Sequence, residues 1–493
     1  MDTSTFAKRQ GHEEAHTDIV DCPNSGRNRG CTALTILHVP GWLSVHSLIV
    51  VLGLLVYVLT SHAMQKRRDP TAAISWVLAI ALIPYIGLPL YLMFGSRKRL
   101  HARSLSVNRA QTPELDPADA WPRQLAAAMG QPPVASYRSL RVHADGAEAL
   151  RALEQVIASA QRELVLCTFI IGRDAVGSAL VARLIAKARS GVRVRLMVDG
   201  FGRLLGGRVS LRELKAAGAQ VVLFGPVLRF PGRNRANLRN HRKMVVADGT
   251  RLWCGGRNFA VEYFEGEAGQ APWRDLSFDL EGPFAAQALE LFNSDWTYAT
   301  GVARSQRITV AALASEPFAQ LVASGPDQAD DTVHNLLVTA CFKAHTRIIA
   351  VTPYFVPGEA LLMALSLAAK RDVKVDLILP LHSNHHLADF VRHRALRTLV
   401  AAGGRVWQTP YMLHAKAMVI DEDLAVSGSA NLDSRSMFLN YELMVAFYAP
   451  SDVRRFSALL EQHQAAAQPY QAGKPGLWRD FTEGLVLWLG FQL

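Results

Sequence analysis

The sequence predicts an α/β fold made of two similar lobes of layered α/β sheets, preceded by an N-terminal pair of transmembrane helices. Three observations predict it. Strand-like and helix-like segments alternate from about residue 140, their order occurs twice, and two long apolar stretches precede them. Alternating strands and helices indicate layered sheets with largely parallel strands. The duplication indicates two lobes that face one another.

Composition limits the class of protein. With 493 residues, half of them apolar, the chain is long enough for two or three domains with a sizeable core. The formal net charge of +11 favours an anionic partner, either nucleic acid or a membrane surface. The five cysteines include no CxxC pair, so neither a disulfide framework nor a zinc site is indicated.

Two apolar stretches, at about 42–60 and 72–94, favour the membrane. Each is long enough to cross roughly 30 Å of hydrocarbon as a helix. A cleavable signal peptide is the alternative for the first stretch, but some forty mostly polar residues precede it and its apolar region is too long, so a membrane span is favoured. We therefore expect two transmembrane helices within 42–96. More basic residues flank the pair than lie in its loop, so the C-terminal part is expected in the cytoplasm.

The remaining chain divides by composition and pattern. The predicted parts are a disordered polar tail at 1–41, a linker at 97–135, a first lobe at 136–310, a second lobe at 311–470 and a C-terminal amphipathic segment at 471–493. The last segment suits either an interfacial helix or a helix that caps the core.

The repeat starts with a strand, a helix and a second strand. In the first half these are 163–170, 176–190 and 192–199, and in the second half 347–355, 359–370 and 373–380. A further helix and a strand then lead to a histidine-bearing strand in each half.

Both halves end in the same spaced signature. It reads His241, Lys243, Asp248, Gly255, Gly256 and Asn258 in the first half, and His414, Lys416, Asp421, Gly428, Ser429 and Asn431 in the second. The distance from His to Asp is seven residues and from His to Asn seventeen in both halves. Identical spacing in two copies indicates two half-sites of one catalytic centre.

Alternation along a strand places the histidine and the lysine of each half on one face. Two such units would surround a phosphate: the lysines neutralise its charge, and Asn258 and Asn431 donate hydrogen bonds to its oxygens. One imidazole attacks phosphorus while the other moves protons, so neither a metal ion nor another cofactor is required.

A nucleophilic imidazole needs its second nitrogen held by a hydrogen bond. A carboxylate follows each motif, Asp275 in WRD and Glu442 in NYE. We expect these acids to orient the histidines, with Glu442 holding His414. Asp248 and Asp421 are interpreted as groups that hold the motif strands.

The paired motifs resemble those of the phospholipase D superfamily over residues 140 to 450. IPYIGLPLYLMFG, TPYFVPGEALLMAL and SGSANLDSRSMFLNYE narrow the resemblance to bacterial cardiolipin synthases. It implies transfer of a phosphatidyl group between two phosphatidylglycerol molecules with release of glycerol. It also implies a phosphohistidine at His241, His414 as acid and base, and the bacterial inner membrane as location. Gly256 replaces the family's serine and leaves Ser429 as the serine contact; activity is expected to survive.

The implied partners are phosphatidylglycerol, other anionic phospholipids and the membrane, without nucleic acid. Three alternatives remain: a phospholipase D that hydrolyses phospholipids or uses other alcohols, a nuclease of the same superfamily, and a lipid-binding protein without activity. The acceptor range and the oligomeric state stay open.

Overall fold

The structure, a computed structural model, describes residues 41–63, 70–95, 121–226, 238–267, 269–302 and 317–490. The chain divides into two units, residues 1–48 and 49–493. In the first unit, only the beginning of helix α1 (Gly41–Ala63) is described. The predicted disordered tail therefore lies outside the described residues, apart from residue 41.

Three helices occupy the apolar N-terminal region: α1, α2 (Pro70–Leu82) and α3 (Pro84–Phe94). The second predicted span is divided at Ile83, because Pro84 has no N–H to continue α2 and instead begins α3. Among the described residues, no helix combines the length and the apolar character needed to cross a membrane. The prediction of two transmembrane helices within 42–96 is therefore not confirmed.

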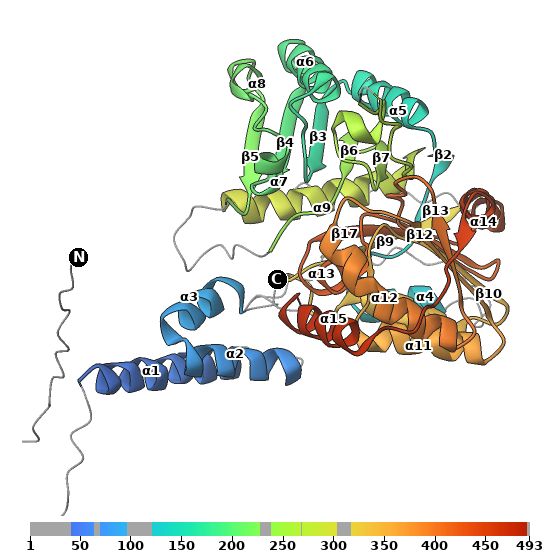
Figure 1. Ribbon diagram of the computed structural model, residues 1–493. Helices are drawn as coiled ribbons and strands as arrows, with labels where there is room; N and C mark the ends of the chain where they lie inside the picture. Colours follow the sequence, from blue (N-terminus) through green and yellow to red (C-terminus); the bar gives the residue numbers. More distant parts are fainter. Residues whose placement is uncertain are drawn as a thin grey trace, which may run out of the picture. The chain divides into compact units, whose positions relative to one another are not determined.

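The first lobe is built on a seven-stranded sheet with the strand order β2-β8-β7-β6-β3-β4-β5 (Figure 1). Its strands are β2 (Arg138–His143), β3 (Glu163–Thr168), β4 (Arg193–Asp199), β5 (Gln220–Phe224), β6 (Met244–Ala247), β7 (Arg251–Gly255) and β8 (Ser277–Glu281). Its helices are α5 (Gly146–Ser159), α6 (Ala175–Arg189), α7 (Gly202–Leu205), α8 (Arg212–Ala216), the 3-10 turn η1 (Val261–Tyr263) and α9 (Pro283–Thr300).

The second lobe is built on a nine-stranded sheet with the order β1-β9-β17-β15-β14-β10-β12-β13-β18. Its strands are β1 (Ala135–Ser136), β9 (Phe318–Ser324), β10 (Arg347–Val351), β12 (Lys374–Pro380), β13 (Arg405–Thr409), β14 (Ala417–Ile420), β15 (Leu424–Gly428), β17 (Glu442–Phe447) and β18 (Gln468–Pro469), while β11 (Phe355–Val356) pairs with β16 (Leu432–Asp433). Its helices are α4 (Trp121–Ala128), α10 (Thr332–Lys343), α11 (Glu359–Lys370), α12 (His386–Ala401), α13 (Ser434–Phe438), α14 (Pro450–Ala465) and α15 (Leu477–Gly490).

The repeat is visible in the strand pairing. β3, β4 and β5 are parallel, as are β10, β12 and β13, whereas the other strand pairs of the two large sheets are antiparallel. The expectation of largely parallel sheets is therefore wrong: both sheets are mixed. The physical reason is that each motif strand, β6 or β14, returns through a short turn as β7 or β15, and a short turn can join only antiparallel strands.

The segment before the first lobe belongs to the second. Residues 121–128 form α4, and β1 pairs antiparallel with β9. The predicted linker at 97–135 is thus a helix and the start of a strand from residue 121 onward, while 97–120 lies outside the described residues. Sequence adjacency suggested a linker, but the Gln131 side chain accepts the Ala323 N–H and the Pro132 carbonyl accepts from Gln320, both in the sheet of the other lobe.

The two lobes share one hydrophobic core. Its buried members include Val165, Leu252 and Phe278 from the first lobe and Leu443 and Phe447 from the second. The rings of Phe278 and Phe447 meet edge to face with their centroids 5.3 Å apart. The core therefore runs from one lobe into the other and packs the two lobes together.

The C-terminal amphipathic segment folds as α15 and packs on α12. Glu483 is buried and bonded to Arg397 at 2.5 Å and to Arg479 at 3.0 Å. Trp478 and Phe481 remain exposed. The helix has both the contact expected of a capping helix and the exposed apolar side chains expected of an interfacial one.

Asp248 and Asp421 hold the motif strands in equivalent ways. Each adopts a left-handed backbone conformation, with φ of 52° and 49°. The Asp421 carboxylate accepts the backbone N–H groups of three consecutive residues, 345–347, at 2.8–2.9 Å, and Asp248 does the same for residues 161–163. Burial opposes ionisation of Asp421, but these N–H donors hold its pKa below the ordinary value.

Replacing Asp421 with Asn should lower stability, since the amide keeps the backbone conformation but presents only one acceptor oxygen. We expect a loss of about 1–3 kcal/mol in the free energy of unfolding, measured as a lower melting temperature. The exposed neighbour Glu422 provides the control, because Glu422→Gln should leave the melting temperature unchanged. Equal melting temperatures for both variants would contradict the strand-holding role.

Candidate active site

The two histidine motifs lie at the boundary between the lobes. His241 and Lys243 precede β6, and His414 and Lys416 precede β14, so the expectation that they lie within the strands is wrong. The physical reason is that their backbones bond across the lobe boundary. The His241 N–H donates to the Tyr441 carbonyl at 2.9 Å, and the His414 N–H donates to the carbonyl of Arg274 at 2.6 Å.

These bonds form two short bridges that are reciprocal. The Tyr441 N–H donates back to Arg239 at 2.8 Å, and the Arg274 N–H donates to Met412 at 2.9 Å. The next residue after each bridge is an acid, Glu442 or Asp275. The backbone pairing therefore delivers each carboxylate to the histidine of the other lobe.

The observed histidine–carboxylate pairs are crossed. His414 Nδ1 lies 2.6 Å from Asp275 Oδ2 and forms a hydrogen bond. His241 Nδ1 lies 3.2 Å from Glu442 Oε1, a looser contact whose geometry falls short of a hydrogen bond. The prediction that Glu442 holds His414 is therefore wrong, because sequence order does not reveal which lobe a side chain faces. Both acids are nevertheless the ones predicted to orient the histidines.

The two lysines are buried in the same volume. Lys243 Nζ donates to the His241 carbonyl at 2.6 Å, and Lys416 Nζ lies 2.7 and 3.1 Å from the ring nitrogens of His414. Burial lowers the pKa of Lys243 to about 8 and that of Lys416 to about 7, although the charges of Glu442 and Asp275 act against this. Since each ammonium interacts with both carboxylates, the two half-sites form one centre.

Both imidazoles are neutral at neutral pH. Burial, followed by the charge of Lys416, lowers the pKa of His414 to about 3. Burial and Lys243 likewise lower the pKa of His241. A neutral imidazole with an oriented Nδ1 can act as a nucleophile or as a base through Nε2.

Aromatic rings surround the two imidazoles. Tyr263 and Trp273 of the first lobe contact His414, with centroid distances of 5.1 and 5.6 Å. Phe169 contacts His241 at 4.9 Å. Sequence reasoning did not identify these rings, although Trp273 lies two residues before Asp275 and gave a local signal. The rings exclude water and so strengthen the electrostatic interactions of the centre.

Two of the three predicted phosphate contacts, Asn258 and Ser429, already have partners within the protein. Asn258 accepts from the Ile170 N–H at 3.3 Å and donates to the Tyr263 hydroxyl at 2.8 Å. The Ser429 hydroxyl donates to Glu442 at 2.5 Å and so helps to orient that acid. The buried Asn431 Oδ1 has no hydrogen-bond partner among the described residues. Contacts of these three residues with phosphate stay a prediction.

The Asp275 carboxylate leaves no room for a side chain at position 256. A Cβ at position 256 would lie 2.3 Å from Asp275 Oδ1. The equivalent position in the second lobe carries Ser429, whose hydroxyl reaches the longer Glu442. The glycine that departs from the family motif therefore leaves room for the carboxylate that holds His414.

Within the part of the chain that the structure describes, no group of three or more His, Cys, Asp or Glu side chains is arranged to hold a metal ion. Lys243 and Lys416, both buried, can supply positive charge to a bound anion.

Restoring the serine as Gly256→Ser should displace Asp275 and loosen its hydrogen bond to His414. We expect turnover to fall by about tenfold or more, the range for loss of a supporting hydrogen bond. Gly473→Ser is the control, because no atom lies within 4 Å of a Cβ placed there. Full activity of Gly256→Ser would show that Asp275 can move without affecting His414.

Comparison with known proteins finds relatives over most of the chain. The family described as "Cardiolipin synthase, PLD-like domain" matches residues 153–296 and 337–464, and "Phospholipase_D-nuclease N-terminal" matches residues 48–96. Cardiolipin synthase A of Pseudomonas aeruginosa is 32% identical over 84% of this chain and 88% of its own length. The cardiolipin synthase of a Geobacillus species is 29% identical over 82% of this chain and 85% of its own.

A solved structure shares the fold. The phosphatidylserine synthase of Haemophilus influenzae superimposes with a TM-score of 0.58 at 11% identity, over 75% of this chain and 96% of that protein. At this identity the likeness concerns the fold alone.

Proposed function

The chain belongs to the cardiolipin synthase family of phospholipase D-like proteins, and we propose that it transfers a phosphatidyl group from one phosphatidylglycerol to another, releasing glycerol. The observation that carries the proposal is the crossed pair of histidine–carboxylate contacts beside two buried lysines. This arrangement supplies a nucleophile, a proton carrier and cationic charge around one phosphate.

In the first step, Nε2 of His241 attacks phosphorus. A phosphorus–nitrogen bond forms, the bond from phosphorus to the glycerol oxygen breaks, and His414 gives its proton to that oxygen. His414 carries little positive charge in the empty site because of burial and Lys416. The negative charge of a bound phosphodiester opposes both effects, so His414 takes up a proton as the lipid binds.

In the second step, the hydroxyl of another phosphatidylglycerol gives its proton to His414. Its oxygen then attacks phosphorus, the bond to His241 breaks, and cardiolipin leaves with His241 neutral again. Throughout, Lys243 and Lys416 neutralise the charge on the phosphate oxygens.

His241 is the proposed nucleophile. Its side chain is 15% exposed, against 5% for His414, so a substrate reaches it more readily. Its carboxylate partner Glu442 is itself held by Ser429 and Asn440, which keeps the imidazole oriented. The more enclosed His414, bound tightly to Asp275, suits the proton carrier.

The proposed location is a bacterial membrane, with the two lobes acting on lipid from the cytoplasmic side. The N-terminal helices support membrane association because apolar side chains such as Val51, Leu55, Leu59 and Ile86 are exposed on them. Anionic phospholipids of that membrane are the proposed substrates.

The product assay is the direct test of function. Purified protein incubated with phosphatidylglycerol vesicles should form cardiolipin and glycerol in equal amounts, resolved by lipid mass spectrometry. His241→Ala and His414→Ala should each lower turnover by several orders of magnitude. Phosphatidic acid as the main product would instead identify a hydrolytic phospholipase D, and cut DNA without lipid product a nuclease.

The crossed pairing predicts different responses to the leaving group. With a phosphatidyl nitrophenol, whose leaving group needs no proton, Asp275→Asn should still release about one nitrophenolate per enzyme, while its turnover of phosphatidylglycerol falls on the order of a hundredfold. Glu442→Gln should slow both substrates alike, because it affects the nucleophile His241. The reverse pattern would make His414 the nucleophile.

The lysine pKa values predict an alkaline limit. Lys416 and Lys243, with pKa values of about 7 and about 8 in the free protein, are charged below these values and neutral above them. The ratio kcat/KM, which reports the free enzyme, should therefore fall as the pH rises through this range. Lys416→Arg keeps its charge and should move the fall to higher pH, even if its maximal rate is lower. An unchanged profile would exclude Lys416 as the titrating group.

A further inference from the structure

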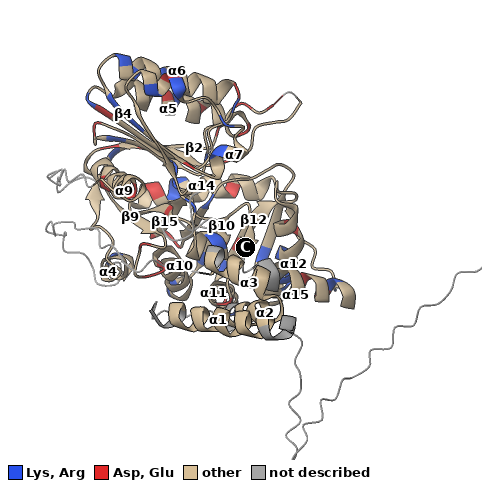
Figure 2. Cartoon of the chain, turned by 90° about the vertical axis from the view of Figure 1, so that its left-hand side faces the viewer, with Lys and Arg blue, Asp and Glu red and all other residues tan. Residues whose placement is uncertain are grey.

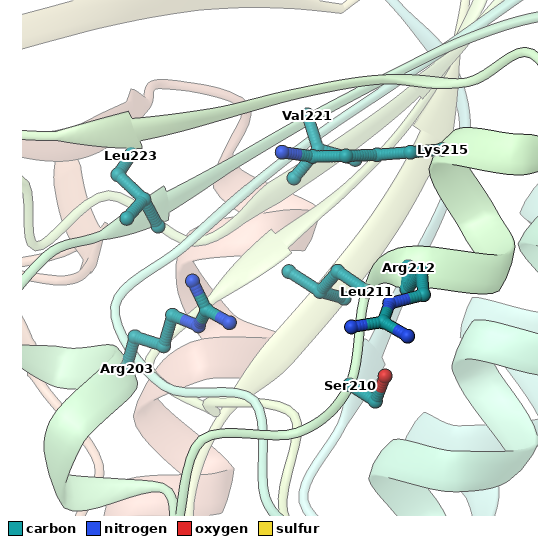
Figure 3. Close-up of a pocket in the computed structure, with 7 residues that line it drawn as sticks. All are labelled: Arg203, Ser210, Leu211, Arg212, Lys215, Val221 and Leu223. Carbon is teal, nitrogen blue, oxygen red and sulfur yellow. The ribbon is translucent and has the colours of Figure 1, made fainter.

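A basic groove of about 430 Å³ lies on the first lobe between α7, α8 and β5 (Figure 3). Its lining combines cationic and apolar side chains: Arg203, Ser210, Leu211, Arg212, Lys215, Val221 and Leu223. Figure 3 shows the charged ends of both arginines and of the lysine directed toward the same space. A surface of this kind fits an anionic group attached to an apolar body.

Arg203 provides a second observation. Its Nε is buried and has no hydrogen-bond partner in the described structure. Residues 200–219 contain three arginines and one lysine but only one acid, Glu213. A phosphate bound in the groove would accept hydrogen bonds from the guanidinium and ammonium groups that line it and would balance the local charge.

Helix α7 carries an exposed apolar ridge next to this groove. Phe201, Leu204 and Leu205 are 43%, 40% and 58% exposed. Large apolar side chains beside arginines are typical of segments that enter the interfacial region of a bilayer. Figure 2 shows blue at α7, whose basic residue is Arg203.

The ridge lies on the His241 side of the first lobe. A Cβ on Gly202 of α7 would meet the Phe169 carbonyl oxygen, and the Phe169 ring contacts His241 at 4.9 Å. The guanidinium of Arg239, two residues before His241, lies 5.9 Å from the Phe201 ring. A bilayer that contacts the ridge would therefore be close to the proposed nucleophile.

We infer that the α7 ridge and the basic groove form a docking site for an anionic bilayer surface. The ridge inserts between lipids, while Arg203, Arg212 and Lys215 bind the phosphate of a headgroup that is not the one reacting. Charge complementarity selects this occupant, since the groove is cationic and its lining includes an apolar wall. The inference rests on the proposed function only in taking phospholipid as the substrate.

Fluorescence of the full-length chain tests the insertion. Cys22 and Cys31 are replaced by Ser, Cys167, Cys254 and Cys341 are buried, and Leu205→Cys carries an environment-sensitive dye. In phosphatidylglycerol vesicles the emission should shift to the blue and be quenched by a lipid-borne quencher, and in phosphatidylcholine vesicles it should not. Arg203→Glu, Arg212→Glu and Lys215→Glu combined should abolish the shift. The matched control replaces the exposed Lys343, Lys370 and Lys374 of the second lobe with Glu and should retain it.

Kinetics separate docking from catalysis. The groove variant should raise the KM for phosphatidylglycerol vesicles by about tenfold, yet keep the kcat/KM of the unaltered protein for a monomeric short-chain phosphatidylglycerol. Loss of activity toward the monomeric lipid as well would overturn the proposal and place the groove in the catalytic site. Suppression of the dye shift by millimolar inorganic phosphate would identify a free-anion site, and burial of the dye by self-association in sedimentation would identify a second copy as the occupant.

These measurements distinguish a failure of the docking proposal from a failure of the proposed function. The dye measurement needs no turnover and can be made with His414→Ala. A dye that inserts in a protein that makes no cardiolipin would contradict the function alone, and a dye that stays exposed in an active enzyme would contradict the docking site alone.

Discussion

The centre depends on one structural constraint, the reciprocal backbone bridges across the lobe boundary. His241 bonds to Tyr441, and His414 bonds to Arg274, so the next residues along the chain, Glu442 and Asp275, reach the opposite imidazoles. Arg242, which lies between His241 and Lys243, reinforces one bridge. It is fully buried, pairs with Asp295 at 2.5 Å and donates to the carbonyls of Glu442 and Ser324 at 3.1 Å. Neither lobe by itself contains a histidine together with the carboxylate that contacts it.

The boundary between the lobes buries charged groups that can act on a bound phosphate. Two ammonium groups and two carboxylates are buried together, and an uncompensated charge in such surroundings is unfavourable. The protein compensates partly through the crossed pairs, yet the pKa values of Lys243 and Lys416 remain lowered toward neutrality. An arriving phosphodiester adds a negative charge beside the two lysines and so favours their charged form. The lysines can then neutralise the charge on the phosphate oxygens, which is a physical basis for selecting a phosphate-containing substrate.

The two lobes hold their motif strands in the same way but support their carboxylates differently. Asp248 and Asp421 hold their strands through equivalent sets of backbone donors. By contrast, Gly256 faces the short Asp275, and the equivalent position in the second half carries a serine that bonds to Glu442. The two carboxylates are therefore supported differently, one by close packing and the other by a hydroxyl. This asymmetry distinguishes the tightly bound His414 from the looser and more exposed His241.

The sequence alone determined the features encoded by local pattern: the two α/β lobes, the paired motifs at equal spacing, and Asp275 and Glu442 as the acids that lie beside the histidines. Period-two and helical patterns and fixed spacings are properties of neighbouring residues, so they can be read along the chain. Tertiary structure decided which acid meets which histidine, the antiparallel return of the motif strands, the place of β1 in the distant sheet, and the break at Ile83. The choice of acid and the place of β1 depend on hydrogen bonds between residues more than a hundred positions apart. The return of the motif strands and the break at Ile83 depend on how neighbouring elements join, which the period of a strand or a helix does not record.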